Sequence, residues 1–210
     1  ADDGTWGLGI SIAAGPVTSI INDHFSELIV GLNPMATEKL WDMMRRASAA
    51  HGTAGIASYA ISAVDNAIWD LKGKLLKRPV YELLGGPVKD QIFCYASNTM
   101  LKYKTSDYMD WFMDLGFKAV KVFLRHGPEE GLAGLNKNVE IIANVREQIG
   151  PDVELAVDSW LSLNIEYAVR VCEALKPYNI KWLEDYMLPE DMDSYAKLRS
   201  RVPGQTLATG

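Results

Sequence analysis

The stretch VELAVDSWLSLNIEYAVRVCEALKPYNIKWLEDY, residues 153–186, decides the fold of this chain. Two apolar, strand-like runs, 153–160 and 180–186, flank a segment whose apolar residues recur at helical spacing until Pro177 ends it. A strand, a helix and a second strand in this order predict parallel strands joined by a helical crossover.

The same alternation continues on both sides of this stretch. Strands are expected at 91–97 and 118–125 and again from 205, with helices at 108–115, 135–149 and 192–198. The pattern fits a doubly wound sheet or a (β/α)₈ barrel. No GxGxxG follows the first strand and no GxxxxGK[ST] occurs, so the sequence favours the barrel. Four and a half units cannot close one, and we expect a partial TIM-like barrel over residues 89–210.

Residues 1–88 have a different texture and are expected to form a separate α+β region. TWGLGISIA, 5–13, is predicted to be a strand, and two helices are expected within 17–49 around the sequence GLNP. Apolar residues step by four and three along 57–76, which indicates a helix. A lone strand needs partners, so we expect the chain to be truncated at its start as well as at its end.

Composition narrows the possible partners. The formal net charge is −6, which argues against nucleic acid and anionic membranes, and no apolar run is long enough to span a bilayer. Two distant cysteines, Cys94 and Cys172, form no CxxC motif and are interpreted as buried residues of a cytoplasmic protein.

Acidic residues stand near the ends of two neighbouring predicted strands. Asp158 and Glu184 are one β-α unit apart, and adjacent parallel strands lie about 4.8 Å from each other. Two such carboxylates can share one cation, and oxygen ligands favour Mg²⁺ over zinc. The alternative is that they cap helices or form ion pairs in loops. Asp185 is expected to point to the opposite face from Glu184.

Several segments then resemble a known family. AISAVDNAIWDLKGKLLKRPVYELLGG (60–86), GFKAVKVF (116–123), LAVDSW (155–160), KWLEDY (181–186) and TLATG (206–210) resemble the enolase superfamily, mandelate racemase branch. DSW followed by YAVR, with PYNIKWLED and HGPEEG, is most similar to its L-rhamnonate dehydratase group.

The resemblance implies a capping domain followed by a barrel, and a homo-oligomer. It implies that Asp158, Glu184 and a residue just past Gly210 bind Mg²⁺. It also implies loss of the proton α to a sugar-acid carboxylate, then of the β-hydroxyl, to give a 2-keto-3-deoxy acid. Without the third ligand and the later strands, this chain alone is expected to be inactive.

One position departs from much of the superfamily. Many relatives carry Lys-x-Lys on the second strand, whereas this chain has Lys121-Val122-Phe123, and Phe123 cannot take a proton. This argues against a racemase or epimerase, which stays the alternative together with an inactive scaffold. The resemblance places the base, a His–Asp pair, on later strands. Lys121 is a candidate catalytic residue, or else a lysine at the barrel rim.

Five further residues are candidates for contact with the substrate. Each has a second reading, as a solvated loop residue or as a packing aromatic. They are Arg125, His126, Trp160, Tyr186 and His51.

Overall fold

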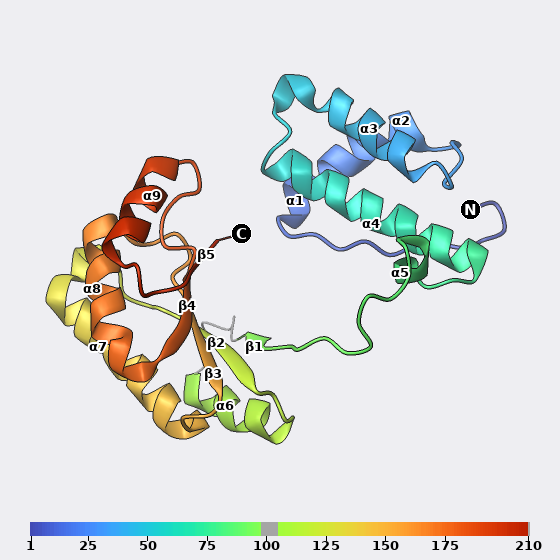
Figure 1. Cartoon of the computed structure of the whole chain (residues 1–210). Helices are drawn as coiled ribbons and strands as arrows, with labels where there is room; N and C mark the ends of the chain where they lie inside the picture. The colour runs from blue at the N-terminus through green and yellow to red at the C-terminus, as the bar shows by residue number, and fades with distance from the viewer. Residues whose placement is uncertain (98–104, 210) are drawn as a thin grey trace. The chain divides into compact units, whose positions relative to one another are not determined.

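The computed structural model describes residues 1–97 and 105–209, which form two compact units, Ala1–Gln91 and Ile92–Gly210 (Figure 1). Within these ranges, the helices lack the combination of length and apolar character that crossing a membrane requires. The domain boundary predicted at 88/89 stays a prediction.

The first unit is helical. Its helices are α1 (Ala14–Ile20), α2 (Ser26–Ile29), α3 (Thr37–Ala47), α4 (Ile56–Leu76) and α5 (Val80–Leu83), with a π-helical turn at Ile21–Phe25 and a 3₁₀ turn at Ala49–His51. The helix predicted at 57–76 is confirmed as α4, and those predicted within 17–49 as α1 to α3. Phe25 and Met44, both fully buried, are central to its small apolar core.

The strand predicted at Thr5–Ala13 is wrong. The segment is extended, but it lies against helix α4 and pairs with no strand in the described part of the chain. Its backbone bonds to side chains instead: Leu8 N donates to Asp70 Oδ2 at 2.7 Å. A strand needs a neighbour to receive its N–H and C=O groups, and alternation of apolar residues does not supply one.

Two glycines allow this close approach to α4. A Cβ atom at Gly7 would lie 1.9 Å from Ala67 O, and one at Gly9 would lie 1.8 Å from Ala63 O. The apolar residues of this segment are exposed, namely Trp6, Leu8, Ile10 and Ile12. The Trp6 ring still contacts α4, because the Lys74 ammonium lies 4.2 Å from its centroid.

The second unit is a parallel sheet with helical crossovers, seen in the lower left of Figure 1. The strands lie in the order β1-β2-β3-β4-β5, and every neighbouring pair is parallel. The elements are β1 (Ala96–Ser97), α6 (Thr105–Asp114), β2 (Ala119–Phe123), α7 (Gly131–Ile149), β3 (Glu154–Asp158), α8 (Ile165–Leu175), β4 (Ile180–Glu184), α9 (Met192–Arg201) and β5 (Leu207–Ala208). This order confirms the β-α alternation expected from the sequence.

The strand order distinguishes a barrel from a doubly wound sheet. Crossovers between parallel strands are right-handed, so a sheet whose strands follow chain order carries its helices on one face. A doubly wound sheet reverses direction at a switch point, and no reversal occurs among the described strands. The second unit is therefore the partial TIM-like barrel that the sequence predicts.

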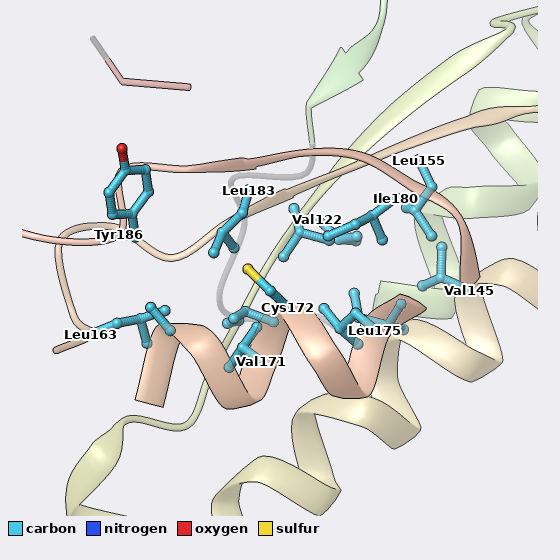
Figure 2. Close-up of a cluster of buried hydrophobic side chains, with 14 of the residues drawn as sticks. Val122, Val145, Leu155, Leu163, Val171, Cys172, Leu175, Ile180, Leu183 and Tyr186 are labelled. Carbon is cyan, nitrogen blue, oxygen red and sulfur yellow. The ribbon is translucent and has the colours of Figure 1, made fainter. Parts of the chain in front are cut away.

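The core of this unit lies between the sheet and its helices. Figure 2 shows Val171, Cys172 and Leu175 of α8 pointing toward residues of the sheet such as Leu183. Burial raises the pKa of the Cys172 thiol to about 11, so it is an apolar core residue. The interpretation of Cys94 as buried is wrong, since its segment is exposed.

The strands predicted at 153–160 and 180–186 extend past the residues at which the observed strands end. Strands β3 and β4 stop at Asp158 and Glu184, because Trp160, Leu161 and Asp185 have positive φ angles of 47°, 62° and 46°. Of the strand predicted at 91–97, only Ala96–Ser97 pairs with a neighbour. The two acids are thus the last strand residues before sharp turns.

Candidate metal centre

The two predicted acids lie side by side at the carboxyl ends of adjacent strands. Asp158 pairs with Glu184 in the β3–β4 register, Phe123 pairs with Asp158 on one side, and Glu184 pairs with Ala208 on the other. Apolar residues of the same strands face the helices. Alternation therefore places both carboxylates on the opposite face, where catalytic residues of such barrels gather.

Hydrogen bonds from backbone and side-chain groups hold the turns that follow. Leu161 N donates to Asp185 O at 2.5 Å, and the Ser159 hydroxyl donates to Glu184 O at 2.9 Å. The Asp158 carboxylate accepts the backbone N–H of Trp160 at 2.9 Å. These bonds tie the β3 turn to the β4 turn, so the two acids are held at a fixed spacing.

Lys121 lies between the two carboxylates. Its Nζ is 2.5 Å from Glu184 Oε1 and 3.1 Å from Asp158 Oδ2, and its side chain is almost fully buried. Burial alone would lower the pKa of Lys121, but its hydrogen bonds to Glu184 and Asp158 outweigh burial and raise that pKa. The ammonium is therefore the cation that the acids require when no metal is bound.

One ammonium does not balance two carboxylates. Asp158 is only 2% exposed, and this burial raises its pKa despite the Trp160 N–H and the Lys121 ammonium. The nearby Glu184 charge acts in the same direction. The cluster thus has an excess negative charge in a poorly solvated place, which a divalent cation would neutralise.

Trp182 is a site residue that the sequence reasoning missed. Its indole Nε1 donates to Glu184 Oε2 at 2.7 Å, so each oxygen of this carboxylate has one partner. The Tyr95 ring packs edge-on against Trp182, with 5.5 Å between the centroids. The signal was available, because Trp182 is two residues before Glu184 and therefore shares its face of the strand.

Asp185 was expected to face away from Glu184, and that expectation is wrong. Its carboxylate joins Asp158 and Glu184 in a group in which one oxygen from each residue lies within 4.8 Å of the other two. The cause is its left-handed backbone, which breaks the alternation of the strand. Thr209 Oγ1 donates to Asp185 Oδ1 at 3.2 Å.

These three carboxylates fit a hard divalent cation. Mg²⁺ binds oxygen ligands at about 2.0–2.1 Å, so its ligand oxygens lie roughly 3–4 Å apart. An all-oxygen group within 4.8 Å needs only small side-chain adjustments to reach that spacing. The third ligand predicted just past Gly210 stays a prediction.

A cavity of about 520 Å³ lies beyond the ends of β2 and β3. It brings together Arg125 and Trp160, two of the residues predicted to contact a substrate, and its wall includes Phe123. The Trp160 side chain is 70% exposed and its ring is 6.2 Å from that of Phe123. This hollow is open and partly aromatic, and its wall includes Ser159, the residue that follows Asp158.

The other predicted substrate residues have different surroundings. His126 is part-buried, and its Nδ1 is 2.6 Å from Glu130 Oε1. Tyr186 is only 4% exposed and packs on Tyr195, which is the setting of a core aromatic. His51 is an exposed residue of the first unit. The predicted substrate contacts of these three residues stay predictions.

The fold and these acids define a (β/α)-barrel protein with a cluster of carboxylates at its strand ends that could hold a metal ion. Residues 1–85 match the mandelate racemase / muconate lactonizing enzyme N-terminal domain, and residues 107–210 match the enolase C-terminal domain-like family. The chain therefore belongs to the enolase superfamily, in its mandelate racemase / muconate lactonizing enzyme branch.

Particular relatives narrow the comparison. The L-rhamnonate dehydratase of Saccharopolyspora erythraea is 42% identical over 209 residues, covering 100% of this chain and 52% of the relative. The chain thus spans about half the length of that curated relative.

Two solved structures also resemble this chain over most of its length. Rhamnonate dehydratase from Gibberella zeae complexed with Mg matches 93% of this chain and 46% of its own, with 34% identity and a TM-score of 0.84. The 3,6-anhydro-D-galactonate cycloisomerase of Zobellia galactanivorans matches 100% of this chain and 57% of its own, with 34% identity and a TM-score of 0.89.

Proposed function

We propose that the protein containing this chain is an Mg²⁺-dependent acid-sugar dehydratase, a hydro-lyase acting on L-rhamnonate or a similar sugar acid. One observation carries the proposal: Asp158 and Glu184 are paired in register at the ends of adjacent strands, with Lys121 between them. The 42% identity to an L-rhamnonate dehydratase supports the substrate class.

The proposed reaction is an elimination. The substrate loses the proton α to its carboxylate, the β-hydroxyl leaves with its bonding electrons, and the resulting enol becomes a 2-keto-3-deoxy acid. Bound Mg²⁺ would supply positive charge that stabilises the negative charge developing on the substrate carboxylate.

The chain's own residues prepare the site for this chemistry. Asp158 and Glu184 would hold the cation, with Asp185 as the adjacent third carboxylate. Lys121, freed from its two ion pairs by the cation, would donate to the substrate carboxylate. Phe123 has no group that accepts a proton, so the proposed base is the His–Asp pair expected on later strands.

A cycloisomerase is the second candidate, because the Zobellia galactanivorans enzyme aligns over the whole chain. The absence of a base at Phe123 counts against those cycloisomerases that need a lysine there. The two functions differ in their products, since only the dehydratase releases water.

The proposed protein is a homo-oligomer without nucleic-acid or membrane partners. Light scattering of the purified protein would test its oligomeric state.

The metal site can be tested on this chain directly. Calorimetric titration with Mg²⁺ should give a binding signal that Asp158→Asn abolishes. Asp152→Asn is the matched control, because the exposed Asp152 precedes the other end of the same strand. Equal Mg²⁺ affinity in both variants would contradict the assignment of Asp158.

The activity requires the complete protein. It should convert a sugar acid to a 2-keto-3-deoxy acid in the presence of Mg²⁺ and lose this activity on chelation. Sugar acids that differ at one hydroxyl would identify the preferred substrate. Isomerisation without loss of water would favour the second candidate.

A further inference from the structure

Helix α7 carries an amide in the middle of its buried face. The buried positions Leu135, Ile142, Val145 and Ile149 follow helical spacing, and Asn138 occupies the position between the first two. Asn138 is only 1% exposed. A buried amide destabilises the fold unless its hydrogen bonds are satisfied, so its partners explain its place in the core.

Three hydrogen bonds of the Asn138 side chain go to the backbone of Arg125 and His126. Its Oδ1 accepts the N–H of Arg125 at 3.1 Å and the N–H of His126 at 3.2 Å. Its Nδ2 donates to His126 O at 2.7 Å. The side chain thus supplies hydrogen-bond partners to the backbone just after β2 ends, as a neighbouring strand would.

The same turn is held from two other sides. His126 Nδ1 lies 2.6 Å from Glu130 Oε1. A Cβ atom at Gly134 would lie 2.6 Å from the Cβ of Glu130 and 3.2 Å from that of His126, so the helix comes close to the turn here. Asn138 therefore acts within a tightly packed contact between α7 and the turn.

The turn forms part of the wall of the cavity beyond the ends of β2 and β3. Arg125 and Gly127 line this cavity of about 520 Å³ together with Trp160. A guanidinium at such a place can bind a carboxylate or a hydroxyl of a sugar acid. Its position depends on the backbone that Asn138 holds.

We propose that Asn138 is a positioning residue, whose carboxamide fixes the Arg125–His126 backbone and thereby sets the affinity of the cavity for a polyhydroxy acid. This inference rests on the proposed function for the identity of the ligand. The positioning itself is a property of the chain and can be measured without activity.

The first measurement is amide hydrogen exchange in Asn138→Leu and Asn138→Asp. Leucine removes the acceptor, so the amides of Arg125 and His126 should lose their protection. Aspartate keeps the acceptor and should preserve much of it. Asn136→Leu is the matched control, because Asn136 is an exposed residue of the same helix. Unchanged protection in Asn138→Leu would overturn the positioning role.

The second measurement uses the complete protein with the sugar acid that it converts. Asn138→Leu should raise KM by about tenfold or more, corresponding to one or two lost hydrogen bonds, with a smaller change in kcat. Affinity for Mg²⁺ alone should be unchanged. If Asn138→Leu does not fold, Asn138→Asp replaces it, with an intermediate rise in KM expected because the donor to His126 O is lost.

The outcomes separate the two proposals. An unchanged KM despite lost amide protection would overturn the role of Asn138 in binding. A fall in kcat and Mg²⁺ affinity in proportion to lost folded protein would also overturn it, since that result marks a purely structural residue. A wild-type protein without dehydratase activity but with the expected exchange pattern would refute the proposed function and leave the positioning intact.

Discussion

Two stretches of this chain look alike as sequence and differ as structure. Residues 5–13 and strand β3 are both apolar runs, but among the described residues only β3 has strands on both sides. The first stretch lies on α4 with its apolar side chains exposed, whereas β3 is buried in a sheet. A strand therefore depends on neighbouring strands that pair with its N–H and C=O groups, since an apolar pattern alone fits both environments.

The largest expected effect comes from removing a buried side chain of β3, compared with an exposed side chain of residues 5–13. Leu155→Ala in β3 removes a side chain that is 0% exposed and should lower the free energy of unfolding by about 3–5 kcal/mol. Ile10→Ala, at a position 77% exposed, should change it by less than about 0.5 kcal/mol. Chemical denaturation of the isolated chain compares the two. Similar losses would mean that residues 5–13 bury their apolar face in solution.

The second effect concerns the ion pairs of Lys121 with Asp158 and Glu184 at the strand ends of the sheet. Lys121→Met leaves Asp158 and Glu184 without their cation and should cost the metal-free chain about 2–3 kcal/mol, less than a fully buried pair because Glu184 is partly exposed. Mg²⁺ should restore most of this loss, as thermal unfolding with and without the ion would reveal.

Lys118→Met provides the control for this experiment. Lys118 is an exposed residue directly before the same strand, so its loss should change stability little. A Lys121 variant as stable as this control would show that the ion pairs are not important for the metal-free fold.

A smaller effect tests how residues 5–13 are held. Gly9→Ala places a Cβ against the α4 backbone at Ala63 and should cost about 1–3 kcal/mol through a local shift. Gly15→Ala, in helix α1 with open space around it, should stabilise by up to about 1 kcal/mol. Equal effects in denaturation experiments would contradict the close packing of this segment on α4.

The smallest effect is a contrast in titration. The Lys74 ammonium and then the Leu8 N–H lower the pKa of Asp70, which holds residues 5–13, whereas burial raises the pKa of Asp158. The stability from Asp70 is present above its unfolded pKa near 3.8 and is lost as pH falls through its lower folded value.

Asp158 has the opposite sign. Its raised pKa means that the metal-free fold loses stability as pH rises from the unfolded value near 3.8 through the folded one. Carboxyl NMR titration should place the Asp70 transition below 3.8 and the Asp158 transition above it. A reversed order would refute the electrostatic contrast between the two regions.

Much of the fold follows from periodicity that is visible in the sequence. The repeat of four and three residues along α4 and α8, and the apolar runs of β2 to β4, are local patterns that burial on one face or two requires. The residues at which these strands end were less predictable. Trp160 and Asp185 have left-handed backbone conformations, which their residue types do not predict.

The sequence by itself determined the parallel β-α order and the placing of two acids at successive strand ends, because strand alternation and chain order are local properties. Only the tertiary structure decided three things: that no strand of the described residues pairs with residues 5–13, that Asp185 joins the acids, and that the Lys121 ammonium bonds to both Asp158 and Glu184. Each depends on a neighbour distant in sequence or on a turn geometry, and neither is encoded in a local pattern.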